Sequence, residues 1–140
     1  MINFIYLTLS NLGFSHPLHP AVTHIPMGMV IGGFLFAAAS LFFKKDELAQ
    51  TAHHCYTLAL IFVLPTMMLG YMDWQYKFDA EWGPLILAKI ILAFVFCGLL
   101  LTAYFIGKTK QMNVKKIIIY GLCLVNAIAL GFLGGEIQYG

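Results

Sequence analysis

Long apolar stretches separated by short polar segments make up most of the chain. Four of these stretches contain at most one charged residue, and they cover residues 25–43, 48–72, 84–107 and 117–135. Each is close to the roughly 20 apolar residues that a helix needs to cross the hydrocarbon core of a bilayer. The pattern therefore predicts four transmembrane helices. Because a bilayer requires backbone polar groups to be satisfied within the protein, we expect an all-α, up-down four-helix bundle.

Residues 1–140 are predicted to form a single transmembrane domain. The first 15 residues are apolar but lack the positive segment and small-residue cleavage site of a signal peptide, so we expect them to lie in the membrane interface. The predicted helices cover residues 20–43, 48–72, 84–107 and 115–136.

The composition supports an integral membrane protein. The chain is 61% hydrophobic and 10% charged, whereas soluble domains have roughly 25% charged residues. Its three cysteines all fall inside predicted spans, and neither CxxC nor CxxCH occurs, so a zinc knuckle or covalently attached haem is not expected.

The distribution of lysine predicts the orientation. Two connections that share one side of the membrane contain Lys44, Lys45, Lys108, Lys110, Lys115 and Lys116. The positive-inside rule places these connections in the cytoplasm. Both chain termini and the loop predicted at residues 73–83 then face outward. The formal charge of +2 follows from this topology and does not indicate nucleic-acid binding.

The segment HPLHPAVTHIP collects His16, His19 and His24 at the start of the first helix. His24 lies in the helix itself, and Gly28 and Gly32 follow it at four-residue spacing. Such a stripe allows two helices to approach closely in lipid, or it leaves room for a flat ring such as haem. The pattern does not separate these two interpretations.

Two further features concern ionisable residues within spans. Lys89, near the outer end of the third helix, either extends to the headgroups, neutralises a haem propionate, pairs with Glu136 or ligates iron. His53 and His54 lie near the cytoplasmic side, roughly 20 Å from His24 at 1.5 Å per residue. They are either hydrogen-bonded interior histidines or part of a second site.

Three motifs carry a resemblance to a known family. HPLHPAVTHIPMG, the G-x-x-D-W of residues 70–74 and the ending LGGEIQYG resemble a family of prokaryotic inner-membrane proteins with four predicted helices, known as domain of unknown function twenty-two thirty-one. The resemblance implies a multi-pass protein of the prokaryotic inner membrane with haem or redox associations, because some relatives are joined to cytochrome or Rieske-type domains. Many relatives have a histidine early in the third helix, where this chain has Lys89.

The favoured functional hypothesis is a cytochrome b-like protein that carries electrons between the quinone pool and an outward-facing redox partner, such as a periplasmic cytochrome. The chain would then be an electron-transfer subunit of an oxidoreductase. His24 is the expected axial ligand of haem b, and the second ligand is sought among His16, His19, Met67, Met68 and Lys89.

Two alternatives remain open. The first is an outward-facing copper or zinc site built from His16, His19, His24 and Met27, because imidazole suits both metals and thioether suits Cu(I). The second is a cofactor-free structural subunit of a homo-oligomer or of a larger complex, surrounded by membrane lipid. Motifs of hydrolases and phosphate-binding loops do not occur.

Overall fold

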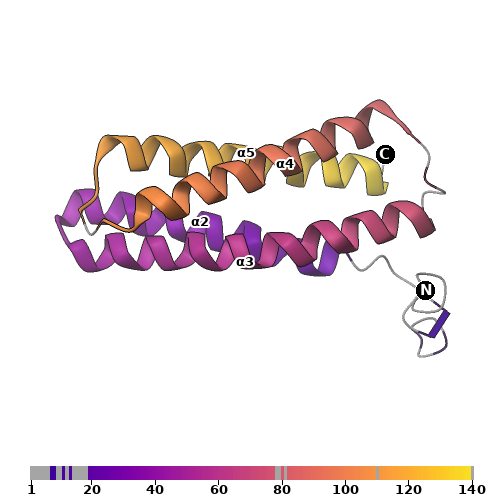
Figure 1. The fold of residues 1–140 in the computed structure, drawn as a ribbon, viewed down its shortest axis with the longest axis horizontal. Helices are drawn as coiled ribbons and strands as arrows, with labels where there is room; N and C mark the ends of the chain where they lie inside the picture. Colours follow the sequence, from indigo (N-terminus) through magenta and orange to yellow (C-terminus); the bar gives the residue numbers. More distant parts are fainter. Residues whose placement is uncertain are drawn as a thin grey trace.

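The computed structural model describes residues 7–8, 11, 13, 19–77, 80, 82–109 and 111–139. Four long helices account for nearly all of this part of the chain (Figure 1), and they are α2 (His19–Phe43), α3 (Asp46–Lys77), α4 (Pro84–Gly107) and α5 (Val114–Tyr139). No strand occurs within the described residues. The fold is therefore the all-α four-helix bundle that the hydropathy pattern predicts.

The helices form a closed ring in which neighbours run antiparallel. α2 packs against α3 and α5, and α4 packs against the same two helices. α2 and α4 begin at one end of the bundle, where α3 and α5 end (Figure 1). We call this the His19 end. The opposite end contains the α2–α3 and α4–α5 connections with their lysines, and we call it the lysine end.

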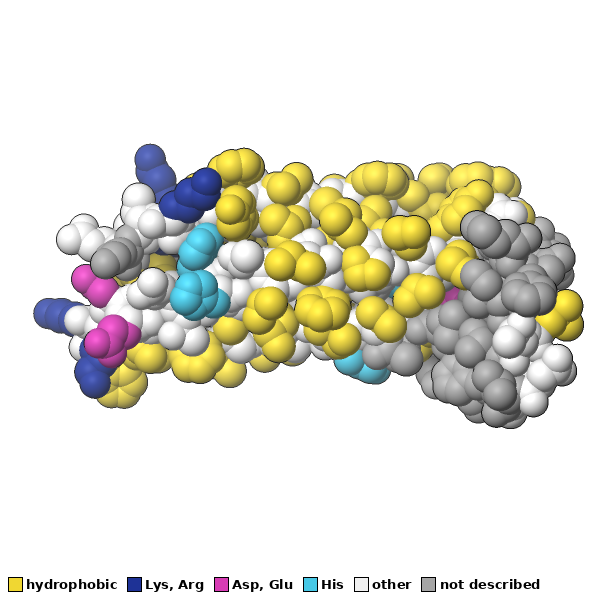
Figure 2. Space-filling view, turned by 60° about the horizontal axis from the view of Figure 1, so that its bottom comes forward, with side chains coloured by type: hydrophobic (Ala, Val, Ile, Leu, Met, Phe, Trp, Pro, Cys, Tyr) yellow, Lys and Arg dark blue, Asp and Glu magenta, His cyan; other side chains and the backbone are white. Residues whose placement is uncertain are grey.

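All four helices are long and apolar enough to cross a membrane. The candidate spans are Val22–Phe43, Asp46–Tyr76, Pro84–Gly107 and Val114–Ile137. Their outer surface is covered by exposed leucine, isoleucine, valine and phenylalanine side chains (Figure 2). In water such a surface would be costly, because burial of apolar area is the main stabilising contribution to a soluble fold. The protein is therefore a multi-pass membrane protein that contacts lipid.

The largest difference from the predicted helix bounds lies at the end of α3. The sequence pattern ends the second helix at residue 72, but α3 continues through Lys77, and the expected loop at 73–83 is correspondingly shorter. Hydropathy falls at Asp73, yet no glycine or proline interrupts the helix before Gly83 and Pro84. Asp73 is only 4% exposed, because it faces the bundle interior. The N-terminal segment predicted to be interfacial lies mostly outside the described residues.

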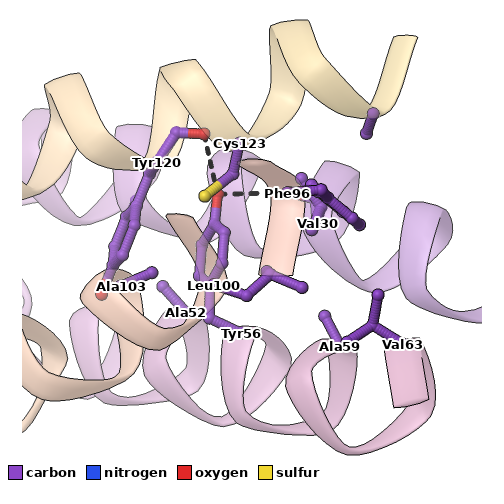
Figure 3. Packing of buried hydrophobic residues seen from close by; sticks show 12 residues of the cluster. Val30, Ala52, Tyr56, Ala59, Val63, Phe96, Leu100, Ala103, Tyr120 and Cys123 are labelled. Carbon is purple, nitrogen blue, oxygen red and sulfur yellow. Dashed lines mark hydrogen bonds between the residues drawn. The ribbon is translucent and has the colours of Figure 1, made fainter. Parts of the chain in front are cut away.

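The buried core lies in the middle of the bundle and extends toward the lysine end. Tyr56 and Tyr120 stack with 4.0 Å between their ring centroids, and both are fully buried. Tyr56 Oη lies 3.2 Å from the Tyr120 carbonyl oxygen and 3.5 Å from that of Val30 (Figure 3). Tyr56 thus links α3 to α5 and α2. Gly33 permits this packing, because a Cβ there would lie 2.8 Å from the Tyr56 ring.

Candidate functional site

A cluster of polar groups lies at the His19 end, and His19 is its centre. The His19 ring crosses from the first residue of α2 to α3, where it packs against Gly70. A Cβ at Gly70 would lie 3.1 Å from His19 Nδ1 and 3.2 Å from its Cε1. Absence of a side chain at Gly70 therefore lets the imidazole lie directly on the α3 backbone.

Two hydrogen bonds fix His19 on α3. Its backbone N–H donates to Asp73 Oδ2 at 2.8 Å, and its Nδ1 lies 2.9 Å from the Thr66 carbonyl oxygen. The first bond satisfies one of the free N–H groups at the start of α2, which is the role that a helix N-cap normally has. Here the cap comes from a neighbouring helix. A negative carboxylate at this position is also favoured by the helix dipole.

The second bond defines the protonation of the imidazole ring. A carbonyl oxygen only accepts hydrogen bonds, so Nδ1 carries a proton. Burial lowers the pKa of His19 below 6.5, and the Lys89 charge lowers this pKa further, against the opposing effects of the Thr66 hydrogen bond and the Asp73 charge. His19 is then neutral at pH 7, with the Nε2 lone pair left as an acceptor.

Lys89 of α4 completes the cluster. It interacts electrostatically with His19 and with Asp73. Its Nζ also lies near α5, since a Cβ at Gly134 would be 3.6 Å away from it. The cluster therefore combines an imidazole, a buried carboxylate and an ammonium group from three helices, with a glycine of the fourth beside them.

The other sequence-predicted site residues lie elsewhere or cannot be described. His24 is exposed on α2, on the lipid-facing surface, and Gly28 is exposed below it. A Cβ at Gly28 or Gly32 would meet nothing within 4 Å, so close helix packing within the chain does not require these two glycines. Glu136 is exposed, and among the described residues Asp73 is the acid whose charge acts on Lys89. His16 lies outside the described residues.

The described residues of the copper or zinc hypothesis, which are His19, His24 and Met27, do not lie together. His19 faces α3, and His24 is exposed. Met27 instead faces α5, because a Cβ at Gly131 would lie 2.7 Å from Met27 Cε. Within the described part of the chain, no group of three histidine, cysteine or acidic side chains is placed to hold a metal ion.

Sequence reasoning missed three members of the cluster, which are Thr66, Gly70 and Asp73. Two of them belong to the G-x-x-D-W motif of residues 70–74, which was noted only for its resemblance. Thr66 gave no signal at all, because it contributes a backbone carbonyl oxygen. The structure thus joins the motif that begins α2 to the G-x-x-D-W motif in the last turns of α3.

These features define a four-helix integral membrane protein with a polar cluster at one end of its bundle. The chain belongs to the family described as predicted membrane protein (DUF2231), whose model matches residues 15–140. This match confirms the resemblance seen in the motifs. No curated protein and no solved structure matches the chain.

Proposed function

We propose that this protein is a membrane b-type haem protein, with His19 as an axial ligand of the iron, that carries electrons between the quinone pool and an outward-facing redox partner. The observation that carries the proposal is the hydrogen bond between His19 Nδ1 and the Thr66 carbonyl oxygen. Histidines that ligate metals usually donate their other ring N–H to a carbonyl or carboxylate, which fixes the tautomer and the ring orientation.

The other cluster residues fit such a role. Lys89 would provide a positive charge for a haem propionate, and Asp73 holds the start of α2, from which His19 projects. The lowered pKa of His19 keeps the imidazole neutral, as a ligand must be. When bound, the haem would supply one-electron transfer. His16, Met67 or Lys89 would provide a further ligand.

The lysine-rich connections support an orientation in which the lysine end lies in the cytoplasm of a prokaryotic cell and the His19 end faces outward. An outward partner would then approach the end of the bundle that contains the cluster. Within the described residues, nothing gathers the ligands of the copper or zinc hypothesis, so we do not carry it as a second candidate.

Absorption spectra of the purified protein, made with ample haem, test the proposal. The wild type is expected to show a Soret band that shifts on reduction. His19→Ala is expected to lose this band, whereas His54→Ala, an exposed histidine at the lysine end, retains it. Absence of a Soret band from a well-folded wild type refutes the haem hypothesis and favours a cofactor-free subunit.

The same spectra decide between the two candidate ligands on α2. The sequence favours His24, whereas the fixed tautomer favours His19. If His24→Ala loses the band and His19→Ala keeps it, the haem lies on the exposed stripe beside Gly28 and Gly32. In that case the His19 assignment is wrong, although the protein still binds haem.

A further inference from the structure

At the lysine end, His53 of α3 and Tyr120 of α5 approach each other over the last residue of α4. A Cβ at Gly107 would overlap His53 Nδ1 and would lie 3.0 Å from Tyr120 Oη. Both polar atoms therefore lie close to the same point of the α4 backbone. Glycine at 107 permits this convergence of three helices.

Neither atom has a hydrogen-bond partner among the described residues, and both are buried. Tyr120 is a fully buried residue; in Figure 3 it extends from α5 toward Ala103 of α4. Buried polar atoms are nearly always bonded to protein or to ordered water, because an unsatisfied one costs free energy in apolar surroundings. Tyr56, which stacks on Tyr120, illustrates the rule, since its hydroxyl lies 3.2 Å from a carbonyl oxygen.

The surroundings hold the His53 ring in place. Tyr104 stacks on it with 5.6 Å between centroids and 27° between planes, and Lys108 Nζ lies 5.0 Å from the Tyr104 ring centroid. The adjoining α4–α5 connection is fixed by Lys116, whose Nζ donates to the carbonyl oxygens of Thr109 and Gln111. Packing of the His53 ring against α4 thus determines where its Nδ1 atom points.

We infer that His53 Nδ1 and Tyr120 Oη bind one hydroxyl group, which accepts the Tyr120 O–H and donates to the imidazole. A single oxygen can serve both atoms, because each such hydrogen bond spans about 2.7–3.0 Å. The hydroxyl belongs either to a water molecule or to a hydroquinone that enters from the lysine end. This site goes beyond the proposed function, since it lies at the opposite end of the bundle and requires no haem.

Solid-state NMR of the wild-type protein in bilayers, with labelled histidine and tyrosine, tests the inference. In quinone-free lipid, a bound water is expected to transfer magnetisation from water protons to His53 Nδ1 and to Tyr120 Cζ, but not to Tyr56 Cζ. Addition of decylubiquinol distinguishes the two sources. Replacement of the water transfer by contacts from the quinol hydroxyl identifies the hydroquinone as the ligand, and persistence of the water transfer identifies water.

Variants supply the controls. Tyr120→Phe is expected to abolish the transfer to His53, and Gly107→Ala is expected to abolish both signals, because the new methyl group overlaps Nδ1. His54→Gln, which alters the exposed neighbour, is expected to leave both signals unchanged. A wild-type protein with neither water nor quinol contacts at these two atoms overturns the inference, as does a direct hydrogen bond between Tyr120 and His53.

Discussion

Two neighbouring glycines of α2 differ in what a side chain would meet, and alanine at each is expected to change stability in opposite directions. A Cβ at Gly33 would lie 2.8 Å from Tyr56 Cε2 and 3.1 Å from Cys55 Cβ. A Cβ at Gly32 would meet nothing within 4 Å. Since both residues lie in the same helical turn, Gly32→Ala is a matched control for Gly33→Ala.

The expected magnitudes follow from two opposing effects. Alanine is more favourable than glycine in a helix interior by about 1 kcal/mol, and this gain applies at both positions. At Gly33 the methyl group also overlaps the ring of Tyr56, which is held by its stack on Tyr120 and by the contact of its hydroxyl with a carbonyl oxygen. Overpacking of a filled core costs about 1–3 kcal/mol. We therefore expect Gly33→Ala to lose up to about 2 kcal/mol and Gly32→Ala to gain up to about 1 kcal/mol.

The free energy of unfolding, measured by steric trapping in bicelles, checks both values. Gly33→Ala should be less stable than the wild type, and Gly32→Ala should not be. Equal stability of the two variants, or a gain at Gly33, would show that the Tyr56 ring is not held in the position described. The reasoning about core packing would then be wrong.

Three further predictions concern polar groups. Asp73→Ala should destabilise the protein by about 2–3 kcal/mol, because a buried charged acceptor of the His19 N–H is lost. In a double-mutant cycle with Lys89→Met, purely additive losses of stability would contradict an electrostatic interaction between Asp73 and Lys89. Because the pKa of His19 is lowered from 6.5, the unfolded chain binds a proton more readily, so the wild type should lose stability as the pH falls through 6.5 toward the lowered pKa. His19→Gln should lack this contribution, and identical pH profiles of unfolding for the two proteins would count against a buried His19. Asn113→Ala should lower the free energy of unfolding by about 1 kcal/mol, because Asn113 Oδ1 accepts the backbone N–H of Lys116 at 3.0 Å. Asn113→Asp keeps this acceptor, so its free energy of unfolding should remain near that of the wild type.

The fold could be predicted from the sequence because a bilayer leaves few alternatives. Four apolar stretches of sufficient length and short connections determine an antiparallel bundle. The same topology predicts that the start of the first helix and the end of the second lie at one end, and the contacts of His19 with Gly70 and Asp73 agree with this. The end of α3 differs from the prediction because hydropathy depends on residue type alone. It therefore gives Asp73 the low value of a loop residue, although this side chain faces the bundle interior.

The face of each helix could not be predicted in the same way. In a soluble bundle, polar residues mark the outer face and apolar residues mark the inner face. In a membrane, lipid and core are both apolar, so this contrast disappears. Four-residue spacing correctly places His24, Gly28 and Gly32 near one another along the helix, but it does not indicate that His24 and Gly28 face outward. His19 lies only five residues before His24, and that offset turns it toward α3 instead.

This difference is the reason that we propose His19, and not His24, as the ligand. Depth in the membrane and glycine spacing favour His24, but neither feature fixes the tautomer of an imidazole ring. A ligand requires a neutral nitrogen with a free lone pair, and that state is stabilised by a specific acceptor for the other ring N–H. The acceptor of the His19 ring N–H is the backbone carbonyl of Thr66, 47 residues away in the sequence. Asp73, on the same helix as Thr66, accepts the backbone N–H of His19 at the start of α2. Because the acceptor is a backbone atom on another helix, no residue type in the sequence could have identified it, and the choice between the two histidines depends on the packing of α2 against α3.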